Sequence, residues 1–444
     1  MPMLGTAAGA PFPSRGRTPG AKMLRWCGMS APAAHPEPIP RATSTRRRVR
    51  PALGVAFTSF VVIGVTDGVL GTAWPAIRHS LHLAIGELGL IQLAGTAGFL
   101  VSSSFSGRIT AHLGRARTMA AAALVGCAAF ALIAASPTLL VLLAGACGVG
   151  IAGGQIESGM QSHVALSARS RTMNLLHGCY GIGATLGPIL LSGLLLLHAS
   201  WRIAYLVLIA IEASVAAGVL RRRRNFAETN PPRRSARPAA ATPAPTATAL
   251  SRPALYSALV LFFVYTGVEV GTGQWAFTLL TAGRHLGTGL AGALVAGYWA
   301  ALTGVRFAVA AAGERVDPNV ILAISAVGAV LGEALLWWNP AQSVGALGLL
   351  LTGAALAPAF PLMMARTPRW ADRQHVSSVI GWQSAAAGLG IAALSGLAGL
   401  LVQRFGLTVL GPYLAALATL YLALQFLALR VQEHGSHVGA RSHE

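Results

Sequence analysis

The sequence predicts an all-α integral membrane protein with twelve transmembrane helices in two six-helix bundles. Three observations support this prediction. Of the 444 residues, 54% are hydrophobic and only 10% are charged, whereas soluble domains carry about 25% charged residues. The chain contains twelve apolar stretches near the length that a bilayer requires, about 20 residues each. A polar linker divides these stretches into two sets of six.

The first half of the chain begins with a basic segment rich in Pro and Ala, residues 1–50, which lacks the apolar core of a signal peptide. We expect a disordered cytoplasmic tail here; the alternative is a start site farther downstream. Six predicted spans follow, at about 53–74, 88–109, 118–135, 138–163, 173–196 and 202–220.

The second half begins with residues 221–253, a linker rich in Arg and Pro without helical periodicity. Six more spans are predicted at about 254–280, 288–312, 319–337, 341–365, 376–402 and 407–429. The predicted domains are therefore a tail (1–50), an N-terminal bundle (51–220), the linker (221–253), a C-terminal bundle (254–430) and a second cytoplasmic tail (431–444).

Arginine is divided unevenly between the turns at the two ends of the spans. The tail, the linker and alternate turns are rich in Arg, whereas the opposite turns hold isolated residues such as Arg202 and Arg404. The positive-inside rule makes the Arg-rich side, with both termini, cytoplasmic, and we expect a multi-pass protein of the plasma membrane. The net charge of +20 then favours anionic lipid and not nucleic acid as a partner.

Several chemistries are disfavoured by missing motifs. Lys22 is the only lysine, and it lies in no P-loop motif. Because a P-loop requires a lysine, the sequence has no P-loop of the kind that drives ATP-powered pumps. The four cysteines show neither CxxC nor metal-ligand spacing, and no GxSxG or HExxH motif occurs in a plausible context. We expect no enzyme activity, no cofactor and no bound metal.

Two carboxylates lie inside predicted spans of the N-terminal bundle, Asp67 in span 1 and Glu157 in span 4. A charge at the bilayer centre costs roughly 2.5–3.5 kcal/mol on insertion scales, so an acid there indicates a function. Because burial disfavours the charged form of a carboxyl group, such an acid can take up a proton at one side and release it at the other. The alternatives are an acid at a helix end for Asp67 and a purely structural hydrogen bond for Glu157.

Polar and aromatic side chains in the spans are candidates for the wall of a solute site. Amides, hydroxyls and indoles suit a hydroxyl-rich ligand; the alternatives are polar contacts between helices and an interfacial aromatic belt. The candidates are Gln155, Gln161, Asn174, His177, Tyr265, Glu269, Gln274, Trp275, Trp382 and Gln383. Arg306, Glu212 and Glu333 also lie within spans but belong to no recognisable motif; Arg306 either reaches the cytoplasmic surface or neutralises a carboxylate.

Several stretches resemble the major facilitator superfamily, including GVTDGVLGTAWPAIRHSLHL in span 1, YTGVEVGTGQWAFTLL in span 7 and APAFPLMMARTP in span 10. The turn after span 2, SGRITAHLGRAR, resembles the superfamily signature Gly-x-x-x-Asp-Arg-x-Gly-Arg. Ala111 and His112 replace its Asp and Arg, which puts the charge-paired latch of that turn in doubt. The resemblance assigns gating roles to Gly107, Gly114 and Arg115, and to Glu314 and Arg315 in the equivalent turn of the second half.

More narrowly, the chain is similar to the fucose-permease-like branch of proton-coupled symporters. That resemblance implies two bundles that rock about a midplane site, and an acid in each of spans 1 and 4 that handles the proton; Asp67 and Glu157 match these positions. The expected function is proton-coupled symport of a small polar, sugar-like solute by alternating access. The expected partners are this small-molecule substrate, protons and the lipid bilayer, and the chain is expected to be a monomer.

Two alternatives stay open. Span 5 contains Gly183-x-x-x-Gly187-Pro188, which resembles a motif of drug antiporters. It favours proton-driven efflux of an amphipathic compound or metabolite. A non-transporting membrane sensor on the same fold is the second alternative.

Overall fold

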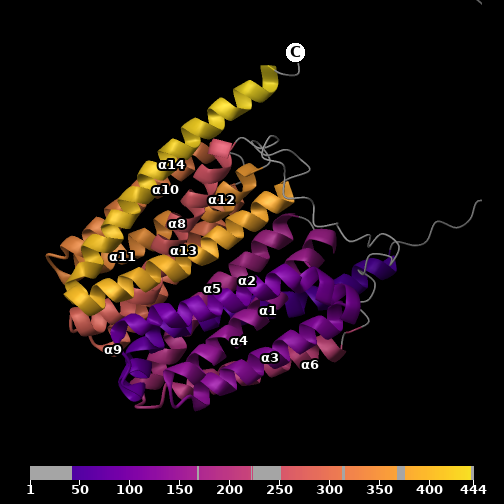
Figure 1. Ribbon diagram of the computed structural model, residues 1–444, viewed down its shortest axis with the longest axis horizontal. Helices are drawn as coiled ribbons and strands as arrows, with labels where there is room; N and C mark the ends of the chain where they lie inside the picture. The colour runs from indigo at the N-terminus through magenta and orange to yellow at the C-terminus, as the bar shows by residue number, and fades with distance from the viewer. Residues whose placement is uncertain are drawn as a thin grey trace, which may run out of the picture. The chain divides into compact units, whose positions relative to one another are not determined.

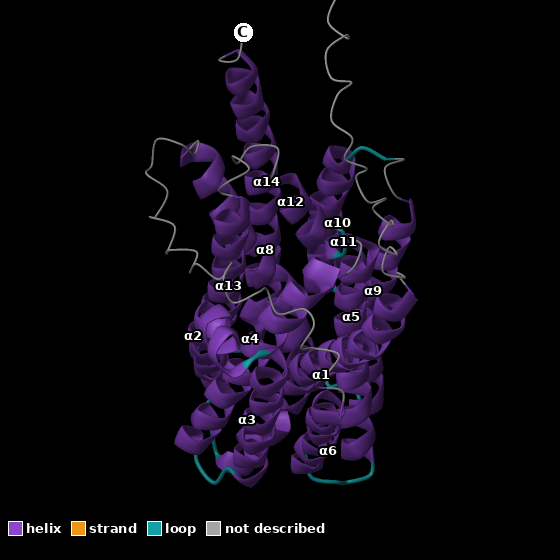
Figure 2. Cartoon of the chain, turned by 90° about the vertical axis from the view of Figure 1, so that its right-hand side faces the viewer, coloured by secondary structure: helices purple, strands orange, loops and turns teal. Residues whose placement is uncertain are grey.

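Long helices account for nearly all of the described backbone. The computed structural model describes residues 43–167, 170–221, 223, 252–312, 316–367 and 376–441, and these contain no strand (Figure 2). The helices are α1 (Thr43–Leu81), α2 (Leu88–Leu113), α3 (Arg115–Ala135), α4 (Leu139–Ser167), α5 (Ser170–Leu196), α6 (Arg202–Arg221), α8 (Arg252–Thr278), α9 (Thr288–Ala312), α10 (Pro318–Trp338), α11 (Gln342–Leu356), α12 (Ala359–Arg366), α13 (Val376–Phe405) and α14 (Leu410–Arg441). Short helical turns precede α2 (η1, Ile85–Glu87), follow α8 (η2, Leu279–Gly283) and precede α14 (η5, Leu407–Val409).

Twelve helical segments in this part of the chain are long and apolar enough to cross a membrane, which confirms the predicted number. Eleven of them are built on one long helix each, and the tenth consists of α11 and α12 in succession. Apolar side chains place these segments in the bilayer, where no water can bind the backbone. The segments are helical because a helix pairs its backbone N–H and C=O groups internally.

Helix ends differ from the predicted boundaries at three places. Span 1 was expected to end at Trp74, before Pro75, but α1 continues to Leu81; a proline removes a single backbone donor, which membrane helices tolerate. The N-terminal tail was expected to reach residue 50, but α1 begins at Thr43, and α14 continues through the expected C-terminal tail to Arg441. Extending an existing helix costs far less than starting one.

The helices of each half of the chain lie together, α1–α6 in one bundle and α8–α14 in the other (Figure 1). In the first bundle α4 packs against α2 and α3, and α3 also packs against α6. In the second, α8 packs against α13 and α14, and α10 against α11 and α14. Most of residues 221–253 and all of 1–42 lie outside the described residues, so the linker stays a prediction, as does the disorder of the tail before Thr43.

The two bundles meet through α5 with α9 and through α2 with α13. We call the end of the spans with the Arg-rich turns the basic end, and the other the weakly charged end. Small residues bring the bundles together at the weakly charged end: a methyl group on Gly89 of α2 would lie 2.3 Å from the Cα atom of Gly396 of α13, and one on Gly292 of α9 would lie 1.8 Å from Ser192 Oγ of α5.

Candidate functional site

The site begins at the contact between α1 and α5, where two glycine pairs face each other. Gly64 and Gly68 on α1 are four residues apart, as are Gly183 and Gly187 on α5. A methyl group on Gly64 would lie 2.0 Å from the carbonyl oxygen of Tyr180, and one on Gly183 would lie 2.0 Å from that of Val61. Small residues spaced four apart allow membrane helices to approach backbone to backbone, and this approach fixes the side chains that flank them.

Asp67 lies next to this glycine contact, at the middle of the spanning segment Gly54–Leu81. Its carboxylate oxygen Oδ2 accepts a hydrogen bond of 2.9 Å from the Tyr180 hydroxyl of α5. Asp67 is therefore a mid-membrane acid and not an acid at a helix end. Its backbone carbonyl accepts a second hydrogen bond, 3.1 Å long, from Gln274 Nε2 of α8. The position of Asp67 is thus held from both bundles.

The opposite side of the site is built on a break in the tenth span. Pro361 has no N–H and cannot donate to the carbonyl of Ala357, four residues earlier, and the chain turns between α11 and α12 at Ala357 and Pro358. Side chains from other helices bind the exposed carbonyls: Tyr265 of α8 donates to Leu356 O at 2.9 Å, and Arg306 Nε of α9 donates to Ala357 O at 3.0 Å. Pro361 therefore leaves the Ala357 carbonyl free to accept from Arg306, and this hydrogen bond positions the cation.

Arg306 also forms an ion pair with Glu269 of α8, with a distance of 3.0 Å between Nη2 and Oε1. The two side chains are 17% and 9% exposed. Glu269 is held further by its backbone carbonyl, which accepts a 2.6 Å hydrogen bond from the Tyr298 hydroxyl. Because breaking a buried pair leaves one charge without compensation, these two side chains depend on each other.

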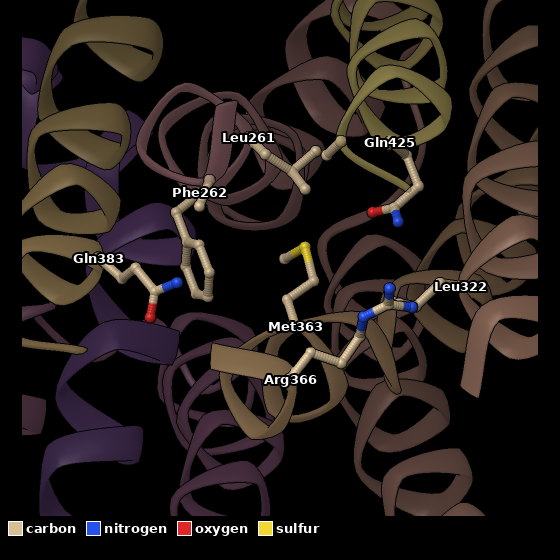
Figure 3. A pocket seen from close by; sticks show the side chains of 9 residues that line it. Leu261, Phe262, Leu322, Met363, Arg366, Gln383 and Gln425 are labelled. Atoms are coloured by element: carbon tan, nitrogen blue, oxygen red, sulfur yellow. The ribbon is translucent and has the colours of Figure 1, made fainter. Parts of the chain in front are cut away.

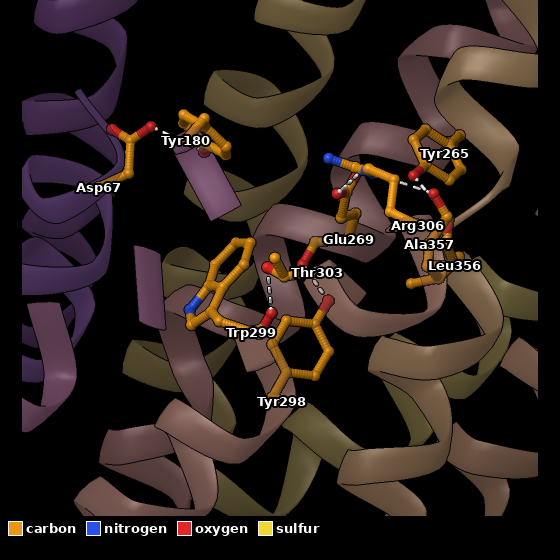
Figure 4. A network of polar contacts seen from close by, with 10 residues as sticks. All are labelled: Asp67, Tyr180, Tyr265, Glu269, Tyr298, Trp299, Thr303, Arg306, Leu356 and Ala357. Carbon is orange, nitrogen blue, oxygen red and sulfur yellow. Dashed lines mark hydrogen bonds and ion pairs between the residues drawn. The ribbon is translucent and has the colours of Figure 1, made fainter. Parts of the chain in front are cut away.

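The two halves of the site face each other across the bundle interface (Figure 4). Asp67 and Tyr180 lie on the side of the N-terminal bundle, and the outer guanidinium nitrogens of Arg306 point toward them. Tyr180 interacts electrostatically with Asp67, Glu269 and Arg306. When Asp67 and Glu269 are both ionised, their charges and that of Arg306 add up to −1. A proton on Asp67 brings this net charge to zero.

Glu157 lies in the half of α4 (Leu139–Ser167) that leads to the basic end, ten residues before the helix ends. It is half-buried. Gln155 lies on another face of α4, where its Nε2 donates to Ser102 O of α2 at 3.2 Å and its side chain lines a groove between α2 and α3. The side chains of Gln161 and Asn174 lie outside the described part of the structure, so their predicted roles stay predictions.

Two other predicted residues, Trp275 and His177, take part in helix packing. Trp275 is fully buried, and its Nε1 donates to the hydroxyl and the carbonyl of Ser395 on α13, at 3.1 and 3.2 Å. His177 on α5 packs edge-on against the Phe60 ring of α1, with centroids 5.7 Å apart. It lies three residues before Tyr180.

The remaining aromatic and amide candidates lie on α13 toward the basic end. Trp382 is half-buried. Gln383 is buried and accepts a 3.0 Å hydrogen bond from the Thr367 hydroxyl. Gln383 also lines a small cavity with Arg366 and Gln425 (Figure 3). Its volume of about 10 Å³ is near the minimum for one water molecule, so it is too small for a sugar.

The predicted gating turn of the first half connects α2 to α3. Gly114 has φ +78°, a left-handed conformation that favours glycine. Arg115 begins α3 and is buried, whereas Gly107 is exposed with open space around it. Glu314 and Arg315 of the second half lie outside the described residues.

The site predicted from the sequence includes neither Tyr180 nor Arg306. Arg306 had a signal in the sequence, since an intramembrane cation requires a partner and Glu269 is an acid in a neighbouring span. Tyr180 had none beyond its position in a glycine-rich span. Elsewhere in the described spans, Glu333 of α10 is fully buried and accepts a 2.5 Å hydrogen bond from the Thr272 hydroxyl. No group of three His, Cys, Asp or Glu residues in the described ranges could hold a metal ion.

Two helical bundles that enclose charged groups at mid-membrane define a carrier of solutes across a bilayer. A sequence model of the Major Facilitator Superfamily matches residues 56–349, and the chain belongs to this superfamily. It is a membrane transporter and not an enzyme. The fucose-permease-like branch stays a prediction.

Several known proteins are similar to the chain. The protein named Bypass of stop codon protein 6 from Saccharomyces cerevisiae is 22% identical over 388 residues, which cover 78% of this chain and 76% of the relative. Among solved structures, a mutant of the nucleoside transporter NupG is 14% identical with a TM-score of 0.69, over 86% of this chain and 99% of that one. A D-xylose-proton symporter is 13% identical with a TM-score of 0.68, over 85% and 97%. At these identities the solved structures show a common fold.

Proposed function

We propose that this protein is a secondary active transporter that couples the movement of protons to the movement of a small polar solute, by symport. One observation carries the proposal: Asp67, an acid at mid-membrane bonded to Tyr180, faces the Arg306–Glu269 pair across the bundle interface. Each of these groups belongs to a helix that moves when the two bundles rock.

The charge balance of the site gives the coupling its physical basis. Exposing a net charge to the apolar interior during reorientation is costly. When Asp67 is ionised the site has a net negative charge, and when it is protonated the site is neutral. In this mechanism the carrier reorients with Asp67 neutral. Glu157, nearer the basic end, is proposed as a second acid that exchanges the proton with that side of the membrane.

The class of solute follows from the polar groups around Asp67. Gln274 is 3% exposed, and its Oε1 has no hydrogen-bond partner among the described residues. This acceptor, the Tyr180 hydroxyl and the Arg306 guanidinium provide both hydrogen-bond donors and acceptors. Such a set suits a solute with several hydroxyl groups, such as a sugar or a related polyol. Arg306 is the cation of this site and is already paired with Glu269. The site therefore does not favour a strongly anionic substrate.

Efflux by proton antiport is the second candidate, and the α1–α5 contact favours it specifically. Gly183 and Gly187, the two glycines of the antiporter-like motif, are the residues that press α5 against α1 beside Asp67. Both candidates use the same acid, and they differ in the direction in which proton and solute move. The experiment below separates them.

The test is solute transport by the purified protein in liposomes, after a thermal-shift screen of sugars, organic acids and cations has identified a stabilising solute. Symport predicts that an acid-outside pH gradient drives accumulation of this solute inside. We expect Asp67→Asn to abolish gradient-driven accumulation while preserving solute exchange, because exchange needs no net proton movement. Glu157→Gln tests the second acid by the same comparison.

Glu87→Gln is the matched control, because it removes an acid at the weakly charged end while its amide oxygen can still accept the hydrogen bond from Ala84 N. This control should accumulate solute like the parent protein. Gradient-driven accumulation that survives Asp67→Asn would refute the role of Asp67. Dissipation of an acid-inside gradient in everted vesicles when solute is added outside would establish antiport instead.

A further inference from the structure

A groove between α2 and α3 on the N-terminal bundle has no part in the transport site. It has a volume of about 570 Å³, its floor is α4, and its lining is mostly apolar. We call it the α2–α3 groove and define it by six of its lining residues: Val101, Phe105, Ile109, Ala121, Val125 and Ile151.

The groove opens toward the lipid. Along α2, the exposed apolar residues Leu90, Leu93, Val101 and Phe105 recur at helical spacing from the weakly charged end into the basic half of the span. Leu124 and Leu132 form a similar exposed stripe on α3. An exposed apolar face of this height in a membrane-spanning bundle is the face that meets hydrocarbon chains.

Basic side chains lie at the basic end of the groove, where Arg108 and His112 complete the lining. Arg108 lies over the Phe105 ring, 5.7 Å from its centroid, so its guanidinium lies above the apolar lining. Neither α2 nor α3 contains a single Asp or Glu residue. Ala111 occupies the position at which the superfamily signature places its Asp, so the turn lacks the acid that would neutralise Arg108.

The α2–α3 groove thus combines an apolar lining with the positive charge of Arg108 at one end. This combination matches an amphipathic molecule with an anionic head. We propose that an anionic phospholipid binds here, with an acyl chain in the α2–α3 groove and its phosphate at Arg108 and His112. Phosphate oxygens form strong charge-assisted hydrogen bonds with guanidinium groups. Basic pockets between transmembrane helices on the cytoplasmic side are typical binding sites for anionic headgroups, and the charge bias of the turns predicts that the basic end is cytoplasmic.

The lipid would take the place of the missing acid in the turn between α2 and α3. Its phosphate provides the negative charge beside Arg108, and its acyl chain fills the space that separates α2 from α3 above α4. This inference concerns lipid binding and does not depend on which solute the carrier moves or in which direction.

The test measures lipid binding by the purified full-length protein in detergent. Phosphatidylglycerol, phosphatidylcholine and soluble glycerol phosphate are added separately, and the unfolding temperature and the lipid retained in native mass spectra are recorded. We expect phosphatidylglycerol to raise the unfolding temperature and to remain bound. Phosphatidylcholine should act more weakly, and glycerol phosphate should have no effect.

Variants distinguish a built site from a general surface charge. Arg108→Gln combined with His112→Gln should weaken phosphatidylglycerol binding at least about tenfold, because the guanidinium and imidazole contacts with the phosphate are lost. Arg117→Gln is the matched control: it removes a positive charge from the exposed surface of the same turn but does not line the groove, and it should bind like the parent. Val125→Trp should reduce retention of both lipids by filling the groove.

Each contrary result overturns the proposal. Equal binding of the two lipids, or an equal loss in Arg117→Gln, would mean that no headgroup site exists at Arg108. Stabilisation by glycerol phosphate alone would mean a site for free phosphate esters without an acyl chain. If Val125→Trp does not fold, the pair of Gln variants, which leaves the apolar packing intact, still decides the question.

Discussion

At the scale of single residues, Arg306 joins two parts of the C-terminal bundle. Its Nε donates to Ala357 O in the break of the tenth span, and its Nη2 pairs with Glu269. One guanidinium thereby satisfies a backbone acceptor that Pro361 leaves open and neutralises an acid in a poorly solvated region. Each interaction uses a different part of the planar fork, which a lysine could not reproduce.

Glu269→Gln is therefore expected to cost about 3–5 kcal/mol of stability, because it leaves the Arg306 charge buried without its partner. Arg306→Gln should cost a similar amount. The double variant should lose much less free energy of unfolding than the two single variants lose together, since it leaves no unpaired charge. The midpoints of unfolding of all four proteins form a double-mutant cycle; additive losses would mean that the two charges do not depend on each other.

The sequence predicts the charged residues of the site better than their partners. An acid such as Asp67 is conspicuous in an apolar span because its transfer cost is high. Its partner Tyr180 lies 113 residues away, and no local pattern connects them. Trp275 shows the reverse case: its pairing with Gln274 suggests ligand stacking, but the fold brings Ser395 within hydrogen-bond distance of its indole.

At the scale of the helices, the α1–α5 contact sets the position of Asp67. Four glycines form it, and the two helices approach so closely that a Cβ atom on Gly64, Gly68, Gly183 or Gly187 would lie within 2.7 Å of a backbone oxygen. The spacing of these glycines is visible in the sequence, but the fact that the two pairs face each other is a property of the folded bundle.

Gly183→Val is expected to lower the unfolding temperature, because its side chain would collide with the carbonyl oxygen of Val61. Overpacking of a close contact costs about 1–3 kcal/mol. It should also impair transport, since Tyr180 would move away from Asp67. Gly193→Val, on the same helix with open space around it, provides the comparison for the unfolding measurements. If the two variants unfold at the same temperature, the contact is not as tight as described.

The number and order of the spans could be predicted from hydropathy, whereas the ends of α1 and α14 and the irregularities within helices could not. The prolines of APAFP signal a disturbance in the tenth span, but two separate helices and the side chains that bind the freed carbonyls follow from packing. The π-helical turn at Leu279–Gly283 likewise has no proline or other local signal that would reveal it.

At the scale of the whole molecule, glycines of α2 and α13 bring the backbones of the two bundles together at the weakly charged end. Gly89 lies against Gly396, and Gly86 against Gly399, where a methyl group on Gly86 would lie 3.1 Å from the carbonyl oxygen. If the basic end is cytoplasmic, as the charge bias predicts, these glycine contacts lie toward the outside. Alternating access then requires these glycine contacts to separate in the opposite state.

Gly89→Val should shift the equilibrium toward the state in which the weakly charged end is open, because a side chain at this position fits only when the bundles separate. The shift can be measured with spin labels on Leu140 and Phe405, exposed residues at that end of the two bundles, in a background without native cysteines. The distribution of distances between the labels should gain a longer component. Gly153→Val, at a position with no atom within 4 Å, should leave the distribution as in the parent. Because a substitution can favour a state only by fitting it better than the other, identical distributions in the two variants would mean that the Gly89–Gly396 contact does not separate during the transport cycle.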